Sequence, residues 1–173
     1  MKPRKLTLIS LTLLTLLVFG TIVLIISTGQ EPLIADQVKL TPKTIDMQNT
    51  ADLQVAVKLI VGEEPDTVSV VDQIDNTTVQ LEGMAAPINT KVTYDKKGKP
   101  DTFVAVFDGG AVKGVIWHII GHMGLSRPNP DAPLTVRLHI TGELNDGTPW
   151  EGSALAVVWN WAGGDPPPPP PPP

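Results

Sequence analysis

The sequence predicts a mainly β protein: an antiparallel sandwich with one short helix, preceded by an N-terminal transmembrane helix. Residues 6–26 contain no charged residue, no amide side chain and no proline, which is typical of a membrane-spanning helix. From residue 37 onward, apolar and polar residues alternate in several short segments, as they do in half-buried strands. One later segment, residues 112–123, instead has apolar residues at helical spacing.

The N-terminal apolar run follows a cluster of basic residues. Residues 1–5 include two lysines and an arginine, and the next basic residue is Lys39. As an α-helix, the 21 residues of the run rise about 32 Å, close to the ~30 Å hydrocarbon core of a bilayer. The positive-inside rule then places residues 1–5 in the cytoplasm and the rest of the chain outside. We therefore predict a single-pass cell-membrane protein with a transmembrane signal anchor at residues 6–27.

Cleavage of the N-terminal segment is the alternative. Ser27 and Gly29 are small residues of the kind found at the −3 and −1 positions of a signal-peptidase site. The apolar region of a signal peptide is usually about 7–15 residues long, and this run is longer. An uncleaved anchor is therefore the preferred interpretation, while a cleaved chain would be secreted.

The chain after residue 30 is acidic and has no cysteine. It carries 10 Lys and Arg against 18 Asp and Glu. Because an acidic domain repels the phosphate backbone, we expect no nucleic acid among its partners. Without cysteine, neither disulfides nor thiolate metal sites stabilise the fold. Only 8 of the 173 residues are aromatic, so we expect a core of Val, Ile and Leu.

A polar tether at residues 28–36 leads into one domain, predicted at residues 37–162. Its first half alternates with period two, and the apolar residues of each segment mark its inward face. We predict strands at 38–41, 54–61, 68–71, 77–82, 91–94 and 102–107. The inward residues include Val55, Val57, Leu59, Val79 and Leu81. Residues 95–101 read as a hairpin loop, and the strand that follows is apolar on both faces, which predicts a central strand.

The pattern then changes to helical spacing. The apolar stripe consists of Val112, Val115, Ile116, Ile119, Ile120 and Met123. Asp108 is the expected N-cap, and Gly124 is the expected stop at the C-terminal end. Prolines at 128, 130 and 133 make the next segment a loop.

Two further strands complete the predicted domain. In residues 134–140 the inward set is Leu134, Val136, Leu138 and Ile140, and the outward set is Thr135, Arg137 and His139. Asn145-Asp146-Gly147 is a turn. In residues 153–161 we place Leu155, Val157, Trp159 and Trp161 on the inward face. About seven short strands, regular turns and one helix are typical of an antiparallel immunoglobulin-like sandwich.

Residues 163–173 form a Gly/Pro-rich tail that ends in eight prolines. Polyproline adopts the polyproline II helix, at about 3.1 Å per residue, because it has no amide donors for other structures. We interpret the tail as a spacer. A docking ligand for an aromatic groove is the alternative.

Three segments resemble the small β-sandwich modules, often repeated, of archaeal and bacterial secreted and cell-surface proteins. They are KLTPKTI at 39–45, TVQLEG at 78–83 and ITGELNDGTPWEG at 140–152. The resemblance implies an immunoglobulin-like extracellular module whose central loop is Asp/Gly-rich and suggests calcium. Here that loop retains only Asp95, Gly98 and Asp101, and lysines occupy three other positions. Because ammonium groups oppose a hard cation, we expect no calcium there.

Three sets of residues are candidates for chemistry or recognition. His118 and His122 are four residues apart on the predicted helix and could chelate a transition metal, but no third ligand is near in sequence. We therefore interpret them as residues flanking the apolar stripe, and assign no metal, cofactor or catalytic residue. Asn76 begins the one Asn-x-Thr sequon and is a glycosylation candidate between two predicted strands. Trp150, Trp159 and Trp161 could form a sugar- or partner-binding surface, although alternation favours a core position for Trp159.

We expect a membrane-tethered or secreted extracytoplasmic module with a structural, adhesive or assembly role and no catalysis. Its expected partners are the membrane, through residues 6–27, and other surface proteins or copies of itself. One alternative is a subunit of an extracellular filament or envelope layer, because edge strands with apolar faces invite pairing between copies. Another is a metal-binding protein or enzyme that uses His118 and His122.

Overall fold

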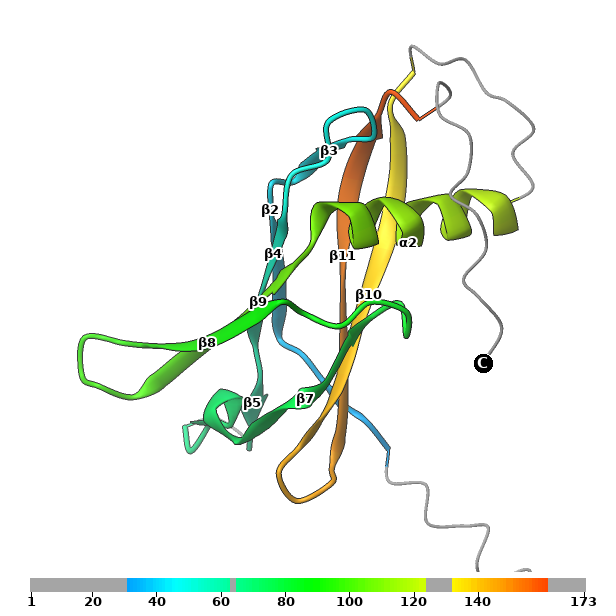
Figure 1. Cartoon of the computed structure of the whole chain (residues 1–173). Helices are drawn as coiled ribbons and strands as arrows, with labels where there is room; N and C mark the ends of the chain where they lie inside the picture. Colours follow the sequence, from blue (N-terminus) through cyan, green and yellow to red (C-terminus); the bar gives the residue numbers. More distant parts are fainter. Residues whose placement is uncertain (1–30, 63–64, 124–131, 162–173) are drawn as a thin grey trace, which may run out of the picture. The chain divides into compact units, whose positions relative to one another are not determined.

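The computed structural model describes residues 31–62, 65–123 and 132–161. The expected anchor, the helix stop at Gly124 and the proline tail lie outside these residues. Within them, no helix is long and apolar enough to cross a membrane. The elements, shown in Figure 1, are β1 (Leu33–Ile34), β2 (Gln37–Thr41), β3 (Thr44–Asp46), β4 (Leu53–Lys58), β5 (Ile60–Val61), β6 (Val68–Ser69), the 3-10 helix η1 (Val71–Gln73), β7 (Ile74–Leu81), β8 (Asn89–Tyr94), β9 (Pro100–Phe107), α2 (Gly109–His122), β10 (Leu134–Leu144) and β11 (Pro149–Trp159).

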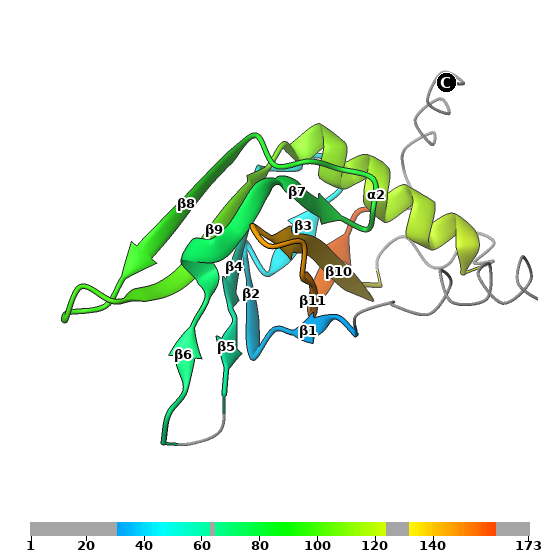
Figure 2. The same ribbon diagram turned by 90° about the horizontal axis from the view of Figure 1, so that it is seen from below.

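The predicted mainly β class is confirmed, with several antiparallel sheets and one α-helix among the described residues. One sheet has the order β1-β11-β10-β7, with β3 also paired to β11, and a second has the order β2-β4-β9-β8. β5 and β6 form a separate hairpin, visible in Figure 2. β9 lies between β4 and β8, so the prediction that this strand is central is confirmed.

One segment, residues 33–46, contributes edge strands to both large sheets. β1 and β3 pair in parallel with β11, whereas β2, between them, pairs antiparallel with β4. The crossing requires a close approach at Gly152, where an added Cβ would lie 2.6 Å from Cγ2 of Val38. Glycine is therefore needed at this point of β11, because any larger residue would push β2 away.

Both large sheets and the helix contribute to one hydrophobic core. The predicted inward faces of the alternating strands are confirmed, and the buried residues are Val55, Val57, Leu59, Val79, Leu81, Val136, Leu138 and Ile140. Their polar neighbours Thr135, Arg137 and His139 are exposed, as predicted. Burial of this apolar surface is the main favourable term in folding.

The helix begins where the sequence predicts. The side chain of Asp108 accepts a hydrogen bond from Ala111 N at 3.0 Å, which makes it the N-cap. Four residues of the predicted stripe are buried, namely Val112, Val115, Ile116 and Ile120, and Ile119 is half-buried. Met123 is 47% exposed, so its assignment to the buried stripe was wrong. It lies one residue past the end of the helix and of the stripe.

The predicted face of the last strand is wrong. In β11 the buried residues are Trp150, Ala156 and Val158, while Leu155 is 49% exposed and Trp159 is 41% exposed. Residues 154–159 are all apolar and differ only in size. Period-two alternation of apolar and polar residues therefore does not show which face of the strand is buried. The register with β10 selects it, because Val136 lies opposite Ala156 and paired residues share a face.

Candidate functional site

The two helix histidines lie close together, but no third ligand joins them among the residues that the structure describes. The ring centroids of His118 and His122 are 4.3 Å apart, in an edge-on arrangement, and both residues are exposed. Across residues 31–62, 65–123 and 132–161, no group of three or more His, Cys, Asp and Glu side chains could hold a metal ion. Two imidazoles alone make a weak and incomplete transition-metal site.

Asn76 lies within β7, which corrects its expected position between strands. It is exposed, and its Nδ2 donates a hydrogen bond to Oγ1 of Thr90 at 3.3 Å. The pairing of β7 with β10 shifts register here, so this part of the strand bulges. Within the bulge the hydroxyl and N–H of Thr77 donate to the Asp75 carboxylate, which lowers the pKa of Asp75. The sequon is thus at an exposed, irregular place on an edge strand.

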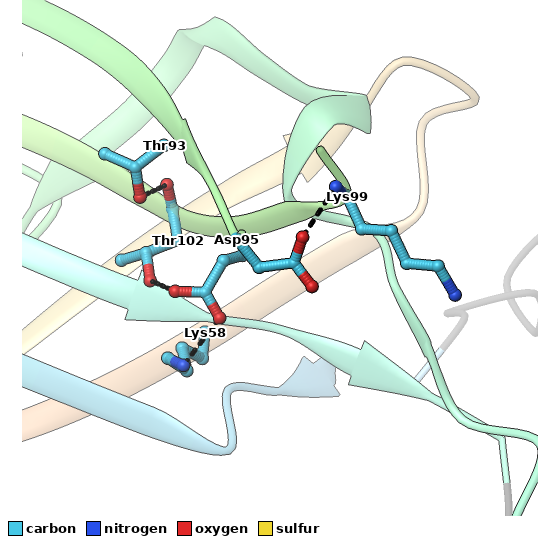
Figure 3. Close-up of polar contacts among 6 residues, drawn as sticks. Lys58, Thr93, Asp95, Lys99 and Thr102 are labelled. Atoms are coloured by element: carbon cyan, nitrogen blue, oxygen red, sulfur yellow. Dashed lines mark hydrogen bonds and ion pairs between the residues drawn. The ribbon is translucent and has the colours of Figure 1, made fainter. Parts of the chain in front are cut away.

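The loop between β8 and β9 is closed by its own aspartate. Oδ1 of Asp95 accepts a hydrogen bond from the backbone N–H of Lys97 at 2.7 Å. It accepts a second from the backbone N–H of Lys99 at 2.9 Å (Figure 3). Gly98 adopts a φ of 75°, which glycine accommodates readily. The carboxylate that the family resemblance associates with calcium therefore fixes the shape of a turn that bears three exposed lysines.

The base of the same hairpin is fixed by Asp101. Its Oδ1 lies 2.7 Å from Nζ of Lys58 in β4, and its Oδ2 accepts a hydrogen bond from the hydroxyl of Thr102 (Figure 3). The bond from Lys58, followed by that from Thr102, lowers the pKa of Asp101. This is the one ion pair among the described residues. Across the hairpin, the hydroxyl of Thr93 donates to the carbonyl of Thr102 at 3.2 Å.

We call residues 93–102 the basic arm. β4 pairs with β9 only from Phe103 onward. The arm is therefore the outer part of the β8–β9 hairpin and extends beyond β4, as Figures 1 and 2 show. It carries Lys96, Lys97 and Lys99, none of which has an ion pair within the described residues. Tyr94, next to the turn, is 61% exposed. The arm therefore presents an aromatic ring beside three lysines, and its charge stays positive because Asp95 offsets only one of them while Asp101 is paired with Lys58.

A second feature, which we call the acidic hollow, lies near the turn between β10 and β11. It has a volume of about 290 Å³ and is lined by Pro32, Thr78, Thr141, Gly142, Glu143, Pro149, Trp150 and Glu151. Thr141 pairs with Glu151 and Glu143 with Pro149, so the two glutamates are diagonal neighbours on one face, about 7–8 Å apart. Both are exposed, and neither has an ion pair in the described part of the chain.

Trp150 lies in the core and is only 1% exposed, so it does not present its ring on the surface that the sequence suggested. Its indole packs against Gly142, its partner on β10, where an added Cβ would lie 2.9 Å from two ring atoms. Trp161 is also buried, and its Nε1 donates to the carbonyl of Ala132 at 3.1 Å. Of the three tryptophans, only Trp159 is available to a partner.

The outer face of β11 forms an apolar surface with Leu155 and Trp159 as its exposed members. Beside it runs a groove of about 470 Å³, lined by Val38, Lys39, Leu40, Thr41, Lys43, Ala154 and Leu155. The groove lies where β2 leaves the edge of β11, between the two short parallel pairings. We call the groove together with Trp159 the β11 surface. Sequence analysis missed it, because it assigned these side chains to the core.

Comparisons with protein-family models, with curated proteins and with solved structures found no match.

Proposed function

We propose that this chain is a membrane-tethered or secreted extracytoplasmic module with a structural, adhesive or assembly role, and that it acts by binding protein rather than by catalysis. The observation that carries the proposal is the β11 surface. Leu155 and Trp159 expose nearly half of their area beside an apolar groove with two lysines on its rim. A contiguous apolar patch with a polar rim is typical of a protein-binding site.

We further propose an immunoglobulin-like topology for the domain. In constant-type immunoglobulin domains, strands A, B, E and D form one sheet and C, F and G form the other. The order β2-β4-β9-β8 corresponds to A-B-E-D, and β11-β10-β7 corresponds to G-F-C. This correspondence supports the likeness to secreted and cell-surface modules. It is an analogy of fold, and the binding role rests on the surface described above.

Four aspartates are held in local hydrogen bonds that stabilise their charged form. The pKa values of Asp46, Asp75, Asp101 and Asp146 are all lowered, in each case mainly by hydrogen bonds from nearby side chains or backbone N–H groups. A general acid needs the opposite shift, a carboxyl whose pKa is raised towards neutrality. These aspartates are therefore suited to stabilising turns in their charged form. The extracytoplasmic location is supported by the basic cap and the apolar run of the N-terminal sequence.

The experiment is site-specific photocrosslinking in intact cells of the native host. A photoreactive phenylalanine analogue replaces Trp159, and in the control it replaces Met84, which is similarly exposed but lies outside the β11 surface. We expect a protein adduct from position 159, lost when Leu155→Glu is added, and none from position 84. The same adducts from both positions, or none from position 159, would contradict the proposed binding role.

A further inference from the structure

We propose that copies of this domain assemble head to tail, with the basic arm of one copy seated in the acidic hollow of the next. The inference rests on the proposed assembly role and names the partner as a second copy of the chain. Two features carry it: three lysines on the arm and two glutamates at the hollow, none of which has an ion pair among the described residues. Opposite charges on separate surfaces of one chain are complementary between copies.

The arm is preorganised for docking. The Asp95 carboxylate holds the turn through the N–H groups of Lys97 and Lys99, and the ion pair of Asp101 with Lys58 holds its base. Binding a fixed loop costs less conformational entropy than ordering a mobile one. The arm also supplies the exposed Tyr94, and tyrosine is one of the residues enriched at the hot spots of protein interfaces.

The hollow matches this arm in chemistry. The prolines at positions 32 and 149 give it apolar surface against which an aromatic ring can pack, whereas the ring of Trp150 lies on the opposite, buried face of β11. Glu143 and Glu151 lie on the same face, where their like charges repel each other at short range. Lysines from a second copy would relieve this repulsion and place opposite charges at the edge of the interface.

The arm and the hollow are separate surfaces, so copies joined through them form a ring or an open chain according to the rotation between neighbours. The arm belongs to the sheet of β8 and β9, and the hollow belongs to the sheet of β10 and β11. In Figure 1 the tip of the arm points away from the β10–β11 turn, so an arm does not reach the hollow of its own domain. Two different surfaces that bind each other form a heterologous interface, which continues from copy to copy.

The test uses two charge-reversed variants of the full chain, purified in detergent and studied by sedimentation velocity over a range of concentrations. The arm variant carries Lys96→Glu and Lys97→Glu, and the hollow variant carries Glu143→Lys and Glu151→Lys. We expect the unmodified chain to assemble at low salt, and each variant alone to weaken assembly by about 100-fold or more, since like charges across an interface cost several kcal/mol. Mixing the two variants should restore assembly, because each arm then meets a hollow of opposite charge.

Two controls separate the proposal from other readings. Lys113→Glu on α2 reverses one charge in the same sense outside both surfaces and should leave assembly unchanged, and Lys96→Arg with Lys97→Arg should preserve it. Circular dichroism confirms that each variant is folded. A monomer at every concentration for the unmodified chain, or a mixture that stays dissociated, would overturn the proposal. If only the arm variant loses assembly, the arm binds a surface of the second copy other than the hollow, and the proposal is overturned. None of these outcomes affects the crosslinking at position 159, which tests the proposed function separately.

Discussion

Gly142 on β10 lies directly opposite Trp150 on β11, and the indole ring occupies the space that a side chain on Gly142 would need. This pairing buries the largest side chain of the core. An added Cβ would lie 2.9 Å from Cζ2 and Nε1 of the ring, closer than real Cβ contacts. Because the ring is enclosed, it has little freedom to move aside.

Gly142→Ala should therefore destabilise the domain by about 1–3 kcal/mol, the usual cost of overpacking a core. Chemical denaturation followed by circular dichroism measures the change. Gly114→Ala is the matched control, since nothing lies within 4 Å of its added Cβ and the position is helical. It should stabilise the domain by about 0.5–1 kcal/mol. Equal effects at both positions would show that the indole does not pack against Gly142.

Leu138→Ala should cost about 2–5 kcal/mol, because the side chain is buried in the middle of β10 and its loss leaves a cavity. Thr135→Ala on the exposed face of the same strand should change the free energy of unfolding by less than about 0.5 kcal/mol. Urea titrations of the two variants compare them directly. Similar costs would place the register of β10 one residue away from that described.

The stability of the domain should fall in acid, between about pH 5 and the lowered pKa values of its aspartates. Asp101 shows why stability falls as the pH is lowered. In the folded domain its pKa lies below the ordinary value of 3.8, mainly because of the hydrogen bond from Lys58. The unfolded chain therefore binds the proton more readily, so the stabilisation is present above pH about 4 and is lost as pH falls through the folded pKa. Urea midpoints measured from pH 7 to pH 2 follow this loss.

Asp101→Asn should make that acid dependence shallower, because it removes one of the groups that titrate. Asp66→Asn is the control, since Asp66 is exposed and takes part in no ion pair among the described residues. The effect at Asp101 should be small, because the side chains of the pair are 36% (Lys58) and 41% (Asp101) exposed, so solvent and salt screen their attraction. An acid dependence identical to that of the unmodified chain would exclude a contribution from Asp101.

Zinc should bind the full chain only weakly, because His118 and His122 supply two ligands and a tight site needs three or four. Calorimetric titration at pH 7.5 and pH 5.5 measures this, and any binding should weaken at the lower pH as protons compete for the imidazoles. Micromolar or tighter binding that His118→Ala abolishes would instead support the metal-binding alternative.

The sequence predicted the elements that have one polar and one apolar face. Residues 134–140 alternate without exception, so burial of Leu138 and exposure of Arg137 follow from period two alone. The helix was predicted with its N-cap because Asp108 precedes a stripe of helical spacing. In these segments, local pattern and tertiary packing agree.

Other parts of the fold depend on partners distant in sequence. β1, β3, β5 and β6 have only two or three residues each, too few for a period to be read, and they form by pairing with longer strands or with each other. The buried face of β11 is selected by its register with β10. The lysines of the arm are visible in the sequence, but the hollow is not, since it joins Pro32 and Thr78 to residues 141–151.

The most direct test of the central claim, an extracytoplasmic domain, uses the absence of cysteine from the chain. Asp72→Cys introduces one thiol on η1, at an exposed position outside the β11 surface, the arm and the hollow. Lys5→Cys introduces one into the basic segment that is predicted to be cytoplasmic, as the matched control. Intact cells are treated with a membrane-impermeant maleimide before and after permeabilisation. The account predicts labelling of Cys at position 72 in intact cells and of Cys at position 5, in an uncleaved chain, only after permeabilisation. Protection of position 72 until the membrane is opened would contradict it.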